Sequence, residues 1–175
     1  MKIKISKKWI IFILFCGYLV FCQSCMRMRM SPKKTTEYFS KSSTTFKDVT
    51  FKISEVHKLH YIETGDSTKP MLLFLHGSPG SWDAYKTYLS DLDLQKKYRL
   101  IAIDRPGFGY SNFSEAQDLE TQANLILAFI QSKNNNQPIT LIGHSMGGPV
   151  AVKLATINPK LFKNLVILAG AIDPK

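Results

Sequence analysis

One serine stands in a setting that is typical of a nucleophile. The segment ITLIGHSMGG, residues 139–148, places Ser145 between Gly143 and Gly147, directly after a run of apolar residues. A serine hydroxyl attacks a carbonyl carbon efficiently only when a base takes its proton and nearby N–H groups hold the charge that forms on the substrate oxygen. The segment therefore predicts acyl-transfer chemistry, and it directs attention to the histidines.

Strand-like and helix-like segments alternate around this serine. Short apolar runs predict strands at residues 50–54, 57–64, 71–77, 98–104, 138–143 and 164–170. Apolar residues spaced by three and four predict helices at residues 81–97, 114–133 and 148–162. This order predicts an α/β fold with three layers, in which helices cover both faces of a mostly parallel sheet. Ligands of such sheets bind at the carboxyl ends of the strands, and the glycine-rich loops of this chain follow those ends.

The context of Ser145 makes its pattern specific. Gly143, Ser145 and Gly147 form a G-x-S-x-G motif with a strand before it and a helix after it. Such a motif predicts a sharp turn with a strained backbone, and side chains on its glycines would collide across the bend. The helix that follows directs the positive end of its dipole at the turn. The backbone N–H of Met146 is then placed to stabilise an oxyanion.

From about Phe46 to Lys175 the chain resembles the N-terminal part of a serine hydrolase of the α/β-hydrolase fold. HGSPGSWDAY, residues 76–85, is similar to the HGxPG loop that follows the third strand of that family, and DRPGFGYS, residues 104–111, is similar to the loop after its fourth strand. The resemblance implies hydrolysis of an ester, amide or C–C bond in a small-molecule substrate, without a metal or an organic cofactor. The site residues that it implies are Ser145 as nucleophile, the N–H groups of Ser78 and Met146 as oxyanion donors, and the glycines Gly77, Gly143 and Gly147. Relatives resembling epoxide hydrolases use an aspartate at the turn, so the serine disfavours that chemistry.

The histidine that this chemistry needs is not evident. Members of the family order their catalytic residues as serine, then acid, then histidine, but no histidine follows Ser145. We expect His57 and His60 to lie at the far edge of the sheet, His76 to shape its loop, and His144 to bond locally. Asp104 and Arg105 are expected to fix their own loop, and Asp173 is a candidate acid after the last strand.

Two interpretations of the missing histidine stay open. The chain is expected to be either a fragment, truncated after strand six and inactive without its acid and histidine, or a complete but degenerate protein. The alternative function is a non-catalytic binding protein that retains the fold.

Most of the net charge of +10 lies near the N-terminus. Eight basic residues flank the first apolar run, namely Lys2, Lys4, Lys7, Lys8, Arg27, Arg29, Lys33 and Lys34. Without them the chain carries 15 basic and 13 acidic residues, so nucleic-acid binding is not predicted. All three cysteines fall within the first 25 residues, which excludes disulfides and cysteine metal sites from the rest of the chain.

The N-terminus is typical of an export signal. Basic residues precede a 13-residue apolar run, residues 9–21, which predicts a signal peptide over residues 1–25. The ending CQSC, residues 22–25, resembles a bacterial lipoprotein signal, which implies lipidation of Cys25 and membrane attachment on the exported side. The alternative is an uncleaved N-terminal membrane anchor. Residues 26–45 are rich in Ser, Thr and Lys and predict a flexible tether, so the hydrolase domain is expected over residues 46–175.

Overall fold

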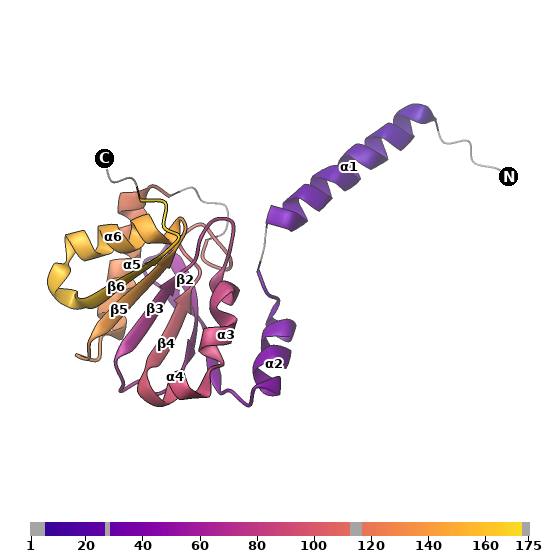
Figure 1. Ribbon diagram of the computed structural model, residues 1–175. Helices are drawn as coiled ribbons and strands as arrows, with labels where there is room; N and C mark the ends of the chain where they lie inside the picture. Colours follow the sequence, from indigo (N-terminus) through magenta and orange to yellow (C-terminus); the bar gives the residue numbers. More distant parts are fainter. Residues whose placement is uncertain (1–5, 27–28, 113–116, 173–175) are drawn as a thin grey trace.

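The computed structural model describes residues 6–26, 29–112 and 117–172 (Figure 1). Six strands of the described chain form one sheet in the order β1-β2-β4-β3-β5-β6. Their bounds are β1 (Phe46–Lys52), β2 (Lys58–Thr64), β3 (Met71–Leu75), β4 (Arg99–Ile103), β5 (Ile139–His144) and β6 (Phe162–Leu168). β2 pairs antiparallel with both β1 and β4, and the remaining pairs are parallel. The predicted mostly parallel sheet is confirmed.

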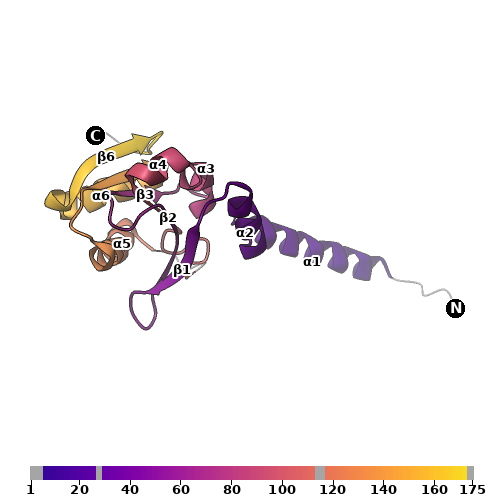
Figure 2. The ribbon, with the colours of Figure 1, turned by 90° about the horizontal axis from the view of Figure 1, so that it is seen from below.

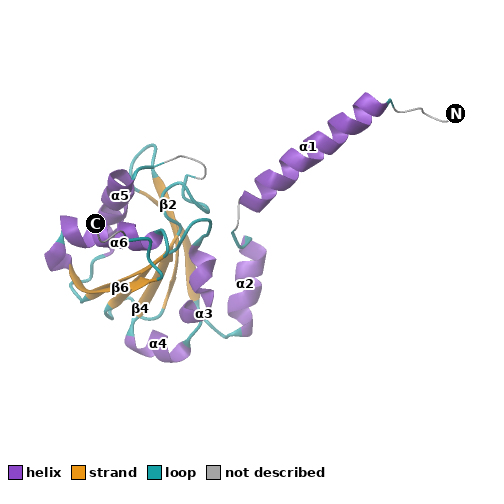
Figure 3. Ribbon diagram, turned by 45° about the horizontal axis from the view of Figure 1, so that its top comes forward, coloured by secondary structure: helices purple, strands orange, loops and turns teal. Residues whose placement is uncertain are grey.

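Helices cover both faces of this sheet (Figure 3). The helices of the described chain are α1 (Lys7–Met26), α2 (Pro32–Lys41), α3 (Lys86–Leu89), α4 (Leu92–Lys97), α5 (Leu119–Lys133) and α6 (Gly147–Ile157), with 3₁₀ turns η1 (Trp82–Tyr85) and η2 (Pro159–Leu161). All of the α-helices except α1 pack against the sheet. Side chains of α5 and α6, such as Phe129 and Leu154, bury the sheet residues of one face. Side chains of α2, η1 and α3, such as Phe39, Trp82 and Leu89, bury those of the other. The predicted three-layer α/β fold is confirmed.

Several predicted elements have different bounds. The helix expected over residues 114–133 begins at Leu119, because the Asp118 side chain caps it by accepting the Thr121 N–H. The helix expected over residues 81–97 is divided into η1, α3 and α4, because the Asp91 carboxylate accepts the N–H groups of Asp93 and Leu94 and starts a new helix. The helix expected to reach residue 162 ends at Ile157, where Asn158 and a proline follow. The first strand begins at Phe46 rather than at residue 50.

A packed helix occupies part of the segment predicted to be a flexible tether. The Ser31 side chain caps α2 by accepting the Lys34 N–H, and Thr35 and Phe39, four residues apart, are both buried. The Phe39 ring stacks on Phe46, with ring centroids 4.6 Å apart, and lies 6.0 Å from the Trp82 ring. The tether prediction is therefore wrong for residues 32–41, whose one apolar face is enough to dock the helix.

The first helix lies apart from the sheet in both views (Figures 1 and 2). Large apolar side chains along α1, including Trp9, Leu14 and Phe21, are more than half exposed. No helix within the described ranges has the length and apolar character that crossing a membrane requires. At the edge of the sheet farthest from β1, the side chains of Leu165, Val166 and Leu168 on β6 are about 40% exposed.

Candidate active site

Ser145 lies on a sharp turn between β5 and α6. Its φ is +49°, in the left-handed region that a residue with a side chain rarely adopts and that costs about 1–3 kcal/mol. The turn is held from β6 and beyond, because the Ser145 N–H donates to the Leu168 carbonyl at 3.0 Å and the Ser145 carbonyl accepts the Ala171 N–H at 3.3 Å. The serine is half-buried, directly before the N-terminus of α6. The backbone therefore presents one hydroxyl in front of a helix dipole.

Three glycines allow the close approaches around this turn. A Cβ on Gly143 would lie 2.6 Å from the Gly147 carbonyl oxygen, and one on Gly147 would lie 2.1 Å from the Leu75 carbonyl oxygen. A Cβ on Gly77 would lie 3.0 Å from the Ser145 Cβ. The loop that follows β3 therefore packs directly against the serine, and the structure brings residues 77 and 145 together at the carboxyl ends of neighbouring strands.

The loop after β3 is fixed from beneath by His76 and Arg105. The His76 Nδ1–H donates to the Gly77 carbonyl at 2.6 Å, and its Nε2 accepts the Arg105 N–H at 2.9 Å. The Arg105 guanidinium donates to the His76 carbonyl at 2.7 Å and to Gln122 of α5 at 2.7 Å. Burial, with a smaller contribution from the Arg105 charge, lowers the pKa of His76 to about 4, so its imidazole is neutral at neutral pH. His76 and Arg105 are structural supports of the loop.

The remaining predicted residues lie as follows. Ser78 is exposed on the loop, and Met146 is 47% exposed at the start of α6. His144 is exposed beside the serine, and within the described residues no histidine nitrogen hydrogen-bonds to the Ser145 hydroxyl. Cys25 lies in the last turn of α1. Asp173 lies outside the described residues.

His60 is not at the edge of the sheet, where the sequence analysis expected it. It lies on β2, inside the sheet between β1 and β4, and is 4% exposed. Its Nδ1 is 2.8 Å from Asp104 Oδ2 and its Nε2 is 2.8 Å from Asp48 Oδ1. The expectation failed because β2 pairs with β4, so its side chains meet the loop that follows β4.

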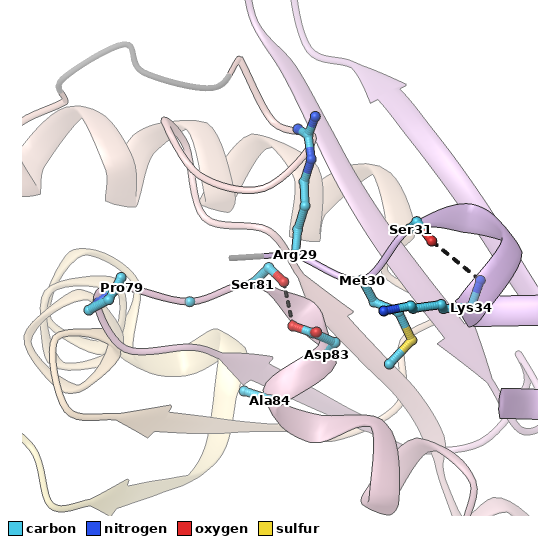
Figure 4. Close-up of a pocket in the computed structure, with 9 residues that line it drawn as sticks. Arg29, Met30, Ser31, Lys34, Pro79, Ser81, Asp83 and Ala84 are labelled. Carbon is cyan, nitrogen blue, oxygen red and sulfur yellow. Dashed lines mark hydrogen bonds between the residues drawn. The ribbon is translucent and has the colours of Figure 1, made fainter. Parts of the chain in front are cut away.

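A cavity of about 560 Å³ opens beside the loop after β3 (Figure 4). One wall comes from residues 79–84 and the other from residues 29–34, which precede and begin α2. Its apolar lining includes Met30, Pro79 and Ala84, and its charged lining comes from Arg29, Lys34 and Asp83. The Asp83 carboxylate accepts a hydrogen bond from Ser81 within the cavity wall.

The loop after β3 connects this cavity to the serine, although Ser145 is not among the residues that line the cavity. A Cβ on Gly80, in its wall, would lie 3.3 Å from the Gly77 carbonyl oxygen, and Gly77 is the residue that packs against Ser145. The N-terminal wall lies within residues 26–45, which the sequence predicted to be a tether, so it was not expected. The signal that could have found it is Ser31 followed by proline, a typical helix start, with Thr35 and Phe39 spaced for one helical face.

Comparisons with known proteins agree with this architecture. Residues 70–175 match the family model described as alpha/beta hydrolase fold. Mouse epoxide hydrolase 4 is 29% identical over 114 residues, which is 63% of this chain and 31% of the relative. Bovine protein phosphatase methylesterase 1 is 28% identical over 144 residues, or 78% of this chain and 38% of the relative. The chain thus spans about a third of the length of these curated relatives.

A solved structure extends the likeness toward the N-terminus. The crystal structure of a bacterial membrane phospholipase A superposes with a TM-score of 0.68, covering 95% of this chain and 52% of the other. Its sequence identity is 23%, so the likeness concerns the fold alone.

Proposed function

Because this chain belongs to the alpha/beta hydrolase fold family, whose model matches residues 70–175, we propose that it carries the nucleophile of a serine hydrolase. The bond cleaved is an ester, amide or C–C bond. The observation that carries the proposal is the left-handed backbone of Ser145 between β5 and α6, with Gly77 packed against it. Backbone strain of this kind persists where the surrounding structure enforces it, and it is concentrated at functional sites.

The proposed reaction uses Ser145 and its neighbouring N–H groups as follows. The Ser145 Oγ bonds to the carbonyl carbon of the substrate and gives its proton to a histidine base. The N–H groups of Ser78 and Met146 stabilise the oxyanion, at about 3–4 kcal/mol for a donor of this kind. The leaving group departs with the proton from the base, and water then hydrolyses the acyl-enzyme.

The histidine base is proposed to come from outside residues 1–175, and Asp173 stays the candidate acid within them. The ring nitrogens of His60 and His76 are already bonded to other partners. This same observation favours the second candidate function, a binding protein that keeps the fold without the chemistry. Epoxide hydrolysis is disfavoured, because position 145 carries serine where the resemblance gives epoxide hydrolases an aspartate.

The experiment uses the protein expressed from its complete reading frame. A fluorophosphonate probe should label Ser145, and Ser145→Ala should abolish labelling and lower ester turnover by roughly 10⁴-fold or more. Ser67→Ala is the matched control, because Ser67 is exposed in the turn between β2 and β3. Labelling at another residue, or equal turnover by Ser145→Ala, would overturn the proposal. Complete absence of labelling would support the binding protein.

We propose further that the cavity between residues 29–34 and 79–84 accommodates the apolar part of the substrate. Met30, Pro79 and Ala84 supply its apolar lining, next to the loop that packs on Ser145. Ala84→Trp should therefore lower kcat/KM for long-chain esters more than for acetyl esters. Thr87→Trp, an exposed position on α3 outside the cavity, is the control. An equal effect of Ala84→Trp on both ester classes would contradict the assignment.

Membrane attachment through the N-terminus is also a proposal. Its support is the exposed apolar surface of α1, together with the basic residues that flank it in the sequence. Cys25 is the proposed lipidation site, and several acyl chains would give stable anchoring where one is marginal. Cys25→Ala should release the protein from the membrane fraction, and Cys22→Ala should not. Retention of Cys25→Ala without a lipid label would instead support the uncleaved anchor.

A further inference from the structure

We propose that His60 is a positioning residue for the hydrolase site: clamped between the carboxylates of Asp48 and Asp104, it holds in place the loop that carries the Ser78 N–H. This inference rests on the proposed function, since it concerns the oxyanion donors of that reaction. His60 does not touch the serine. It acts through Asp104 and the backbone bonds that Asp104 accepts.

The His60 ring is positively charged when it bonds to both carboxylates. Both ring nitrogens of His60 face carboxylate oxygens, at 2.8 Å each. An ionised carboxylate only accepts hydrogen bonds, so both nitrogens donate when both bonds are present, and the ring is then an imidazolium. Burial alone would lower the pKa of His60, but the hydrogen bonds and charges of Asp104 and Asp48 outweigh it and raise the pKa above its ordinary value of 6.5.

Asp104 connects His60 to two loops. Asp104 is fully buried, and its carboxylate accepts the Trp82 N–H at 2.7 Å and the Tyr110 N–H at 2.8 Å as well as the His60 ring. The Ser111 hydroxyl adds a parallel link, because it accepts the His60 backbone N–H at 2.6 Å and donates to the Asp104 carbonyl at 2.7 Å. One carboxylate thus joins β2 to the loops after β3 and β4.

The bond from Trp82 to Asp104 fixes one end of the loop that carries Ser78. The loop of residues 76–81 is fixed at its start by His76 and Arg105 and at its end by the bond from the Trp82 N–H to Asp104. Ser78 lies between these two fixed points and is exposed. A buried carboxylate that loses its cation is strongly destabilised, so loss of the His60 charge would loosen the second fixed point.

The two carboxylates around His60 are not equivalent. The Asp48 side chain on β1 is 38% exposed, whereas the Asp104 side chain is fully buried. When the imidazolium loses a proton, we expect Nε2 to lose it, because water can replace the bond to Asp48 but not the bond to Asp104. The Tyr110 ring also lies beside His60, with its centroid 5.0 Å away, and the Arg29 guanidinium stacks on the Tyr110 ring.

The test measures fluorophosphonate inactivation of Ser145 from pH 6 to 9 in the protein expressed from its complete reading frame. Deprotonation of the catalytic base should raise the wild-type rate at the acid end of this range, and loss of the His60 charge should add a decline at its alkaline end, because the pKa of His60 is raised. His60→Gln should slow inactivation by about tenfold at pH 6.5 and remove this alkaline decline, since small misplacements of catalytic groups have effects of this size or larger. Asp48→Asn should keep the acceptor but move the decline to lower pH.

The control is His57→Gln, a histidine of the same hairpin whose Nδ1 contacts only Ser54 in the described chain. It should leave the rate and its pH dependence unchanged. A folded His60→Gln protein with wild-type inactivation at every pH would overturn the inference. If His60→Gln does not fold, Asp48→Asn decides, and an unmoved alkaline decline overturns it.

A second measurement separates this inference from the proposed function. Trp82, the residue bonded to Asp104, is the fluorescent reporter, and its emission is obtained as the difference between the protein and its Trp82→Phe variant. Its emission should change between pH 6.5 and 9, and His60→Gln should abolish the change. If Ser145 fails to react while this signal is present, the proposed function fails and the positioning role of His60 stands. An emission that is independent of pH overturns the positioning role of His60 and leaves the proposed function standing.

Discussion

β2 takes part in two buried ionic clusters with opposite designs. Toward the carboxyl end of β4, the imidazole of His60 lies between two carboxylates. Toward the amino end of β4, the carboxylate of Glu63 lies between two cations, accepting from Lys47 at 2.9 Å and from Arg99 at 2.9 Å. Each cluster joins β1, β2 and the β4 region, and their partners from that region, Arg99 and Asp104, lie at opposite ends of β4.

The difference lies in which central group can titrate near neutral pH. The Glu63 cluster keeps its charges through neutral pH, because burial raises the Glu63 pKa but Arg99 and Lys47 together lower it below its ordinary value. The His60 cluster loses a charge as pH rises, since its pKa lies above 6.5 only by virtue of its two carboxylates. The Glu63 cluster, formed with Lys47 and Arg99, is therefore a permanent link within the sheet. The His60 cluster, formed with Asp48 and Asp104, is a conditional one, because its charge depends on pH.

The largest expected effect comes from breaking the permanent cluster. Arg99→Met leaves the Glu63 carboxylate, which is 2% exposed, with Lys47 as its cation and also removes the bond from Arg99 to the Lys133 carbonyl. Removing one partner of a buried ion pair destabilises a protein by about 3–5 kcal/mol. Urea unfolding at pH 7 measures this loss. Near pH 4 the loss should shrink, because protonation of Glu63 removes the uncompensated charge.

A double variant supplies the control for that prediction. Glu63→Met combined with Arg99→Met replaces the buried pair by apolar groups and should recover most of the stability lost in the single variant. A double variant as unstable as Arg99→Met alone would show that packing of the arginine stem, rather than the charge left behind, determines the effect.

The next effect comes from crowding the conditional cluster. Gly109 has a φ of +53°, and a Cβ there would lie 2.1 Å from the Asp104 Cγ. Gly109→Ala should therefore displace the carboxylate that binds His60 and the Trp82 N–H, and destabilise the protein by about 1–3 kcal/mol. Gly80→Ala, whose Cβ would meet its nearest atoms at 3.3 Å, is the milder comparison in urea unfolding. Equal losses for the two variants would contradict the assigned role of Gly109.

These two clusters also mark what the sequence could and could not predict. The turn at Ser145 is encoded within ten residues, as a strand, a G-x-S-x-G motif and a helix, so local pattern was sufficient. The bond between His60 and Asp104 joins residues 44 apart, and that between Glu63 and Arg99 joins residues 36 apart. Both depend on the pairing of β2 with β4, which alternating apolar residues do not specify.

The prediction for the N-terminal wall of the cavity failed for another reason. Composition suggested a tether, whereas α2 docks through a few residues, among which the Phe39 ring stacks on Phe46 and Trp82. A composition average over twenty residues does not detect a single buried aromatic ring. The start signal at Ser31 and the Thr35–Phe39 spacing are local, so weighing position above composition would have found the helix.

A smaller effect separates the clusters by pH. The folded pKa of His60 is raised, so its contribution to stability is complete below about pH 6.5 and declines as pH rises through the folded value. Stability of the wild type should therefore fall on the alkaline side, and Asp48→Asn should reduce this fall. Urea midpoints from pH 6 to 9 measure it. Arg99→Met should keep the same alkaline slope as the wild type, and a changed slope would mean that the two clusters are not independent.

The smallest effect concerns the exposed member of the permanent cluster. The Lys47 side chain is 61% exposed, and Lys47→Met leaves the buried bond between Glu63 and Arg99 intact. Pairs that involve an exposed lysine contribute about 0–1 kcal/mol, so urea unfolding should show a loss below about 1 kcal/mol. Lys52→Met on the same strand is the matched comparison, because its partner Glu55 is itself 90% exposed, and it should show almost no loss. If Lys47→Met destabilised the protein as much as Arg99→Met, Glu63 would need both cations, and the permanence of this cluster would depend on a lysine at the surface.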